Sequence, residues 1–114
     1  MLKKENRIRL KNHFDQVFKR GSSFYYKILG VKICDNNLEY SRLGVIVSTK
    51  VSKKAVRRNQ LKRIIRDFFQ DNIEKIKNSK DVIVIALPEI ENKEKNEINE
   101  VLFNAFKKMN LIND

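Results

Sequence analysis

The spacing of apolar residues along the chain predicts three helices. Within residues 53–69, apolar side chains recur at the i, i+3, i+4 and i+7 spacing of one helical face, and residues 98–109 carry a similar stripe. We expect the helix that contains residues 53–69 to continue to about residue 76. A shorter helix follows Asn12, which we expect to cap it, and ends at Gly21.

Between these helices the composition changes to that of strands. Residues 22–34 are rich in aromatic and β-branched side chains and predict one long strand, or two short ones divided at Gly30. Residues 41–49 predict the next strand. The nearly continuous apolar run at 81–87 is typical of a central, buried strand. The order is therefore helix, two or three strands, helix, strand, helix.

Length and composition fit one small α+β domain that spans residues 1–114 and contains a mixed sheet. With 41% hydrophobic residues, the chain has enough apolar side chains to form a core. Its 25 Lys and Arg against 14 Asp and Glu give a net charge of +11, which favours a nucleic-acid partner. We expect residues 1–9, which are mostly basic, to form a loose arm.

The cations are concentrated on the middle helix, and no acid precedes Asp67 there. An ordinary solvated face would mix both signs and pair Glu with Lys one turn apart. Unpaired cations at helical spacing repel one another, so they predict a surface that binds a polyanion. These cations are Lys53, Lys54, Arg57, Arg58, Lys62, Arg63 and Arg66, and Asn59 lies among them.

The same helix resembles a signature of the protein component of bacterial ribonuclease P, A-V-x-R-N-x-x-K-R-x-x-R. The matching residues are Ala55, Val56, Arg58, Asn59, Lys62, Arg63 and Arg66. Upstream, L-x-x-x-F-x-x-V-F-x-x-G of the same family is matched by Leu10, Phe14, Val17, Phe18 and Gly21, and further matches are Arg42, Gly44 and Lys50. The resemblance implies that the basic helix binds a catalytic RNA subunit. It also implies a left-handed strand–helix–strand crossover, a rare connection.

The resemblance further implies a cleft between the first helix and the sheet, which binds the single-stranded 5′ leader of precursor tRNA. We assign Phe14, Phe18, Tyr26 and Lys50 to this site. For the two phenylalanines, base stacking and plain core packing are both open, since one ring can do both. Tyr25 and Tyr26 point to opposite faces of a strand, so one of them can line the cleft. The family often carries an aromatic residue where this chain offers Lys32.

No set of residues in the sequence predicts catalysis by the protein itself, and we assign no catalytic residue. Metal-dependent nucleases place several carboxylates around bridging ions. Asp67 and Asp71, one turn apart, could bind a cation, although such pairs more often offset neighbouring Lys and Arg. The resemblance implies that the chain is the protein subunit of an endoribonuclease whose RNA performs hydrolysis with Mg²⁺. We expect no cofactor bound by the protein.

The main alternative is a ribosomal-type structural RNA-binding protein of similar composition. A helix-turn-helix DNA-binding protein is disfavoured because strands surround the basic helix. The single cysteine, Cys34, excludes an internal disulfide, and no apolar run is long enough for a signal peptide or a membrane span. We therefore expect a cytoplasmic protein whose partners are the RNA subunit and precursor tRNA, with neither DNA nor a membrane among them.

Overall fold

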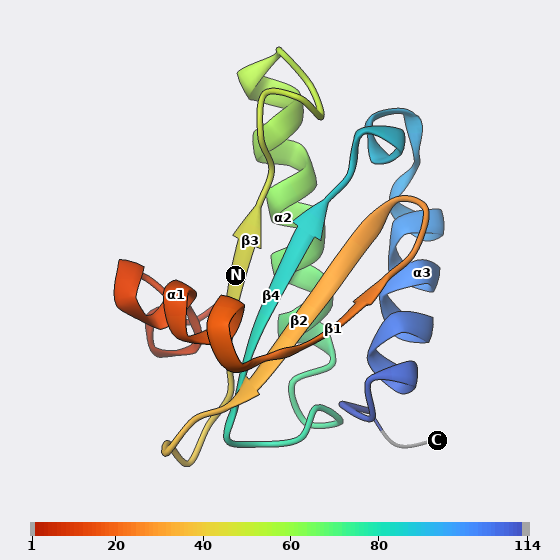
Figure 1. Ribbon diagram of the computed structural model, residues 1–114. Coiled ribbons are helices and arrows are strands. Elements are labelled where there is room, and N and C mark those ends of the chain that lie inside the picture. Colours follow the sequence, from red (N-terminus) through yellow and green to blue (C-terminus); the bar gives the residue numbers. More distant parts are fainter. Residues whose placement is uncertain (1, 113–114) are drawn as a thin grey trace.

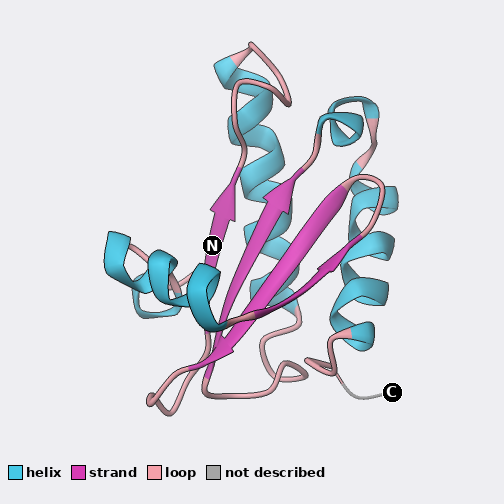
Figure 2. Cartoon of the chain, in the orientation of Figure 1, coloured by secondary structure: helices cyan, strands magenta, loops and turns pink. Residues whose placement is uncertain are grey.

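The computed structural model describes residues 2–112, which form three α-helices, two short 3₁₀ helices and four strands (Figures 1 and 2). The predicted order of elements and the α+β class are confirmed. In chain order the elements are η1 (Lys4–Asn6), α1 (Lys11–Arg20), β1 (Ser22–Tyr25), β2 (Leu29–Asp35), β3 (Arg42–Ile46), α2 (Ala55–Asp71), β4 (Lys80–Ala86), η2 (Pro88–Asn92) and α3 (Lys95–Lys108).

The four strands form one mixed sheet in the order β1-β2-β4-β3. The pairs β1–β2 and β2–β4 are antiparallel, and β3–β4 is parallel. Helices α2 and α3 cover one face of the sheet, and α1 crosses the other (Figure 1). In this view β3 lies to the left of β4, both strands run upward, and α2 descends behind them. The β3–α2–β4 crossover is therefore left-handed, against the usual hand.

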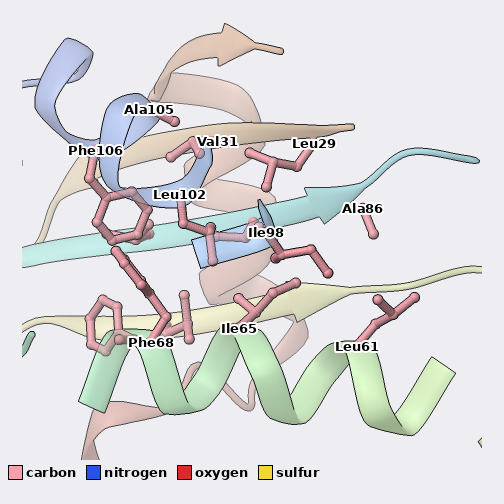
Figure 3. Packing of buried hydrophobic residues seen from close by; sticks show 14 of the residues in the cluster. Leu29, Val31, Leu61, Ile65, Phe68, Ala86, Ile98, Leu102, Ala105 and Phe106 are labelled. Carbon is pink, nitrogen blue, oxygen red and sulfur yellow. The ribbon is translucent and has the colours of Figure 1, made fainter. Parts of the chain in front are cut away.

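The main core lies between the sheet and the helices α2 and α3. Along β4, Val82 and Val84 face these helices while Ile83 faces α1, so the strand is buried on both sides, as its apolar run predicts. The apolar stripes of the two helices meet over the sheet (Figure 3), where the Phe68 and Phe106 rings pack edge to face at 5.4 Å. Such packing between aromatic rings contributes roughly 0.5–1.5 kcal/mol beyond the burial of their surface.

Three predicted boundaries differ from the structure. Helix α1 begins one residue before Asn12, and its first turn is closed by the carbonyl of Leu10 rather than by a side-chain cap. The strand predicted at 22–34 is divided by a turn at residues 26–28, so Gly30 lies inside β2 and not at the break. Helix α2 ends at Asp71, where the Asn72 side chain donates a hydrogen bond to the carbonyl of Phe68 (2.8 Å).

The N-terminal segment also differs from the expected loose arm, because residues 2–8 pack along the β3 edge of the sheet. Leu2 and Ile8 are buried. The Asn6 side chain donates a hydrogen bond to the Ser41 carbonyl (2.8 Å), and the Ile8 amide donates one to the Leu43 carbonyl (2.9 Å). Two buried apolar residues and these hydrogen bonds hold Arg7 of this segment beside α2.

A buried ion pair joins the two parallel strands on the α1 side of the sheet. Arg42 donates two hydrogen bonds to the Asp81 carboxylate (2.8 and 2.6 Å), and Asn36 donates a third (2.8 Å). His13 on α1 accepts a hydrogen bond from Arg42 at Nδ1 (3.0 Å). The bond to Asp81 raises the pKa of Arg42 despite its burial. This network connects α1 to the sheet.

Removing the charge of Asp81 should destabilise the fold strongly. The Asp81 and Arg42 side chains are only 4% and 14% exposed, so Asp81→Asn leaves a mostly buried cation without a counter-charge. We expect a loss of about 3 kcal/mol in the free energy of unfolding, measured by urea denaturation. The matched control is Asp35→Asn, which removes an ion pair with Lys80 whose carboxylate is 81% exposed and should cost less than about 1 kcal/mol. Equal losses would contradict this role of the buried pair.

Candidate RNA-binding surface

Helix α2 buries one side and presents cations on the other. Leu61, Ile65, Phe68 and Phe69 face the core. The opposite side and the flank next to the N-terminal segment form what we call the basic face, which consists of Arg58, Asn59, Lys62, Arg63 and Arg66. Within residues 2–112, none of its cations makes an ion pair with a carboxylate. Lys53 and Lys54 are exposed immediately before the helix and extend this positive surface.

Arg57 differs from the other cations of the helix. Its guanidinium donates hydrogen bonds to the carbonyl of Glu91 (3.0 and 2.7 Å) and to that of Lys93 (2.8 Å), on the side of α2 that faces α3. These bonds satisfy carbonyl groups in the connection that leads into α3. The structure thus separates Arg57 from the basic face and gives it a role in joining α2 to α3. Arg58 also bonds a carbonyl, that of Ser52 (2.9 Å), and remains on the basic face.

Arg7, which we did not assign from the sequence, lies beside the basic face. It lines a hollow of about 410 Å³ together with Leu2, Asn59, Arg63, Arg66 and Asp67. The Nε atom of Arg7 is buried and has no hydrogen-bond partner within the described residues. Burial, and the positive charge of Arg7, lower the pKa of Arg66 below its ordinary value. The hollow therefore holds guanidinium groups close together without a sufficient counter-charge.

A second candidate site lies on the α1 face of the sheet. The Phe14 ring is half-buried and packs against Gly44, where an added Cβ would come within 2.6 Å of the ring. Phe18, one turn further along α1, is 45% exposed. The two phenylalanines therefore share one helix face, with Phe14 nearer the core and Phe18 nearer solvent. The sequence is compatible with both core packing and ligand contact for each of the two rings.

Tyr26 does not join these rings. Because Tyr25 pairs with Gly30 in the β1–β2 ladder, Tyr25 shares the α1 face, and Tyr26 packs on the main core side with its ring edge to face against Phe24 (4.9 Å). The residue of this strand that can line an α1-side cleft is thus Tyr25, which is 52% exposed. Lys50 is exposed in the loop between β3 and α2. This loop lies away from α1 in Figure 1.

The two acids assigned as a weak cation site lie in different surroundings. Asp67 is half-buried beside Arg63 and Arg66 in the hollow described above, whereas Asp71 is exposed at the end of α2. Within the described chain, no group of three or more His, Cys, Asp or Glu side chains could hold a metal ion. Over the same residues, no helix is sufficiently long and apolar to span a membrane.

Comparisons of the sequence with known proteins point to one family. A family model described as Ribonuclease P matches residues 2–110. The ribonuclease P protein component of Clostridium botulinum (strain 657) is 38% identical over 111 residues, which cover 96% of this chain and 99% of that protein. That of Alkaliphilus metalliredigens is 35% identical over 111 residues, with 97% and 99% covered.

Solved structures give the same result at the level of the fold. The RNase P protein of Staphylococcus aureus superposes with a TM-score of 0.89 at 32% sequence identity, covering 95% of this chain and 98% of that one. The Thermotoga maritima RNase P protein gives a TM-score of 0.81 at 34% identity, with 90% and 96% covered. By sequence and by structure, over nearly its whole length, this chain belongs to the ribonuclease P protein family.

Proposed function

We propose that this protein binds the catalytic RNA of ribonuclease P through the basic face and Arg7, and binds the 5′ leader of precursor tRNA on the α1 face. The observation that supports RNA binding most directly is a helix face whose cations have no carboxylate partner among residues 2–112, next to a buried guanidinium atom without an acceptor among the same residues. Phosphate oxygens supply the missing acceptors and the missing negative charge. We place this complex in the cytoplasm.

Hydrolysis in this proposal belongs to the RNA subunit and its Mg²⁺ ions. Among the described residues, neither Asp81 nor Asp67 fits a catalytic metal site. Asp81 is held in its ion pair with Arg42, and Asp67 stands beside Arg63 and Arg66, whose charges oppose a divalent cation. The protein therefore contributes electrostatic neutralisation and positioning, and we assign it no catalytic residue.

The α1 face suits a single-stranded ligand. Phe18 presents an exposed ring, and Phe14 fixes the position of α1 by packing on Gly44. An exposed ring on a rigid helix can stack a base of any identity, which suits leaders of variable sequence. This site would make precursor tRNA bind better than mature tRNA, which lacks the leader. A ribosomal-type RNA-binding protein should not show this preference for precursor over mature tRNA.

The function is tested by cleavage of precursor tRNA with a ribonuclease P RNA at low Mg²⁺, with and without the protein. We expect the protein to restore cleavage, and the complex to bind precursor more tightly than mature tRNA. Phe14→Leu/Phe18→Leu keeps much of the apolar volume and should weaken precursor binding alone, by roughly 1–3 kcal/mol for each base that loses stacking. Phe103→Leu on α3 is the control for loss of an aromatic ring on the other side of the sheet. A wild-type complex that binds both tRNAs equally would refute leader recognition.

The contribution of the basic face is measurable as a salt dependence. Neutralising four phosphates should give a slope of roughly −3 to −4 in a plot of log affinity for the RNA subunit against log salt concentration. Arg58→Ala/Arg63→Ala should reduce its magnitude by about 1.5–2. Lys75→Ala/Lys108→Ala removes the same charge from exposed positions outside α2 and should leave the slope nearly unchanged. If both double variants gave the same slope, the basic face would not be part of the interface with the RNA subunit.

Arg66 should lower the stability of the free protein, although it contributes to RNA binding. Its lowered pKa means that the folded state disfavours the charged form of Arg66. At neutral pH Arg66 is charged in both the folded and the unfolded state. The loss of folding stability is therefore present throughout the working pH range. Arg66→Met keeps the apolar stem and should raise the free energy of unfolding by up to about 1 kcal/mol, seen as a higher melting temperature, yet weaken RNA binding. Arg63→Met, at an exposed position, should weaken binding without raising the melting temperature. Destabilisation by Arg66→Met would contradict this account.

A further inference from the structure

The hydrogen bond between His13 and Arg42 defines the charge state of His13. Nη1 of Arg42, on β3, lies 3.0 Å from Nδ1 of His13, on α1. A guanidinium group only donates hydrogen bonds, so Nδ1 of His13 must accept this one. The imidazole ring is therefore neutral in this contact and carries its proton on Nε2. In this neutral form His13 joins α1 to the sheet.

Arg42 is not free to turn away from His13. Its Nε and Nη2 atoms donate hydrogen bonds to the two carboxylate oxygens of Asp81, and Nη1 is the nitrogen that remains for His13. Both side chains of this ion pair are mostly buried, so turning Arg42 outward would leave a buried carboxylate without its counter-charge. Repulsion between His13 and Arg42 would therefore displace α1 rather than Arg42.

Helix α1 has few other contacts to resist such a displacement. It has 10 residues, too few for a stable isolated helix, and Val17 is its buried residue. Phe14 adds a half-buried ring that packs on Gly44. No side chain of the described residues caps the first turn of the helix with a hydrogen bond. The position of α1 thus depends largely on two apolar side chains and on the hydrogen bond of His13.

Protonation of His13 would turn this attraction into repulsion. An N–H group at Nδ1 would face the N–H group of Arg42 at the 3.0 Å contact, with no acceptor between the two cations. His13 also lies between two hollows, of about 450 and 150 Å³. The charged and titratable side chains that line these hollows or bind Arg42 are Lys4, Glu5, Arg7, Arg9, Arg20, Cys34, Asp35, Tyr40 and Asp81.

The acids of this set offer little compensation for a charge on the imidazole. Asp81 is already paired with Arg42. Asp35 is paired with Lys80, and its carboxylate is largely exposed. Glu5 is exposed as well, so solvent and salt screen its charge. The protonated ring would therefore gain no partner that replaces the lost hydrogen bond.

We propose that His13 is a positioning residue that holds α1 on the sheet in its neutral form and weakens this attachment when it is protonated. Histidine is the side chain that changes charge between about pH 5 and 8. Because the neutral form makes the contact, the stability that His13 contributes is present at neutral pH and is lost as the pH falls. Acid should therefore loosen the helix that carries Phe14 and Phe18. The consequence for precursor tRNA, weaker binding in acid, rests on the function proposed above.

Hydrogen exchange of the free protein tests the attachment, with His13→Asn as the matched variant. The Asn side-chain oxygen occupies the place of Nδ1 and accepts from Arg42 at every pH. When the pH is lowered from about 7.5 to about 5.5, the α1 amides of the wild type should lose about 10-fold more protection than those of His13→Asn. The melting temperature should fall by about 4 °C more. Comparing the two proteins at one pH cancels the intrinsic exchange rate and the titration of other groups.

A permanent charge should reproduce the acid state at neutral pH. His13→Lys should show loosened α1 amides at about pH 7.5, with no further loss on acidification relative to His13→Asn. Asn12→Lys adds the same charge to the exposed neighbouring position in the first turn of α1 and should leave the helix protected at about pH 7.5. This control separates the contact with Arg42 from the general effect of a cation at a helix N-terminus. Melting curves report whether each variant is folded.

The outcomes separate the role of His13 from the function of the complex. Equal losses of α1 protection in the wild type and His13→Asn on acidification would refute the proposal, as would equal protection of His13→Lys and Asn12→Lys. In the complex with a ribonuclease P RNA, the preference for precursor over mature tRNA should decrease in acid more for the wild type than for His13→Asn. If the wild-type complex shows no such preference at about pH 7.5, the proposed function fails, and the free protein still decides the role of His13.

Discussion

The structure depends on the burial of β4 between two strands and two layers of helices. Its neighbour β3 runs parallel to it, and parallel strands need a long connection, which is α2. That connection packs one side on the sheet, so its other side is left to solvent and can carry charge at little cost to the core. The position of the basic face therefore follows from how β4 is buried, and the cations of that face determine which ligands it can bind.

The two faces of the sheet are unequal, and this inequality leaves room for the second candidate site. The side covered by α2 and α3 carries the continuous core, whereas among the described residues the buried apolar cluster of the α1 side consists of Ile8, Val17 and Ile83. One short helix cannot cover four strands, so Phe18 and Tyr25 remain exposed beside it. The network of Arg42 with Asp81 and His13 ties α1 to the sheet by polar contacts, without closing that face.

Periodicity predicted the elements whose burial is a local property of the sequence, namely α2, α3 and β4. It missed the turn at residues 26–28, which contains no Gly, Pro, Asn or Asp. Alternation predicts that Tyr25 and Tyr26 lie on opposite faces but not which of them shares the face of α1, and Tyr26 lies on the main core side. Periodicity missed the packing of the N-terminal segment because two isolated apolar residues among cations give no period. The cations of the basic helix were visible in the sequence, but the partners of Arg57 are carbonyls more than thirty residues away, which only the fold brings near.

The proposed division of ligands between the two sides of the molecule has an energetic consequence. Sites that share no residues contribute nearly independently to binding, so the affinity for the RNA subunit need not change when the leader is released. The basic face, where Arg7 and Arg66 repel each other in the free protein, gains a counter-charge on assembly, and this favours a long-lived complex. In the same proposal, a few stacking contacts on the α1 face suit a ligand that must leave after each cleavage. In this proposal, the same small sheet therefore binds one RNA durably and exchanges another.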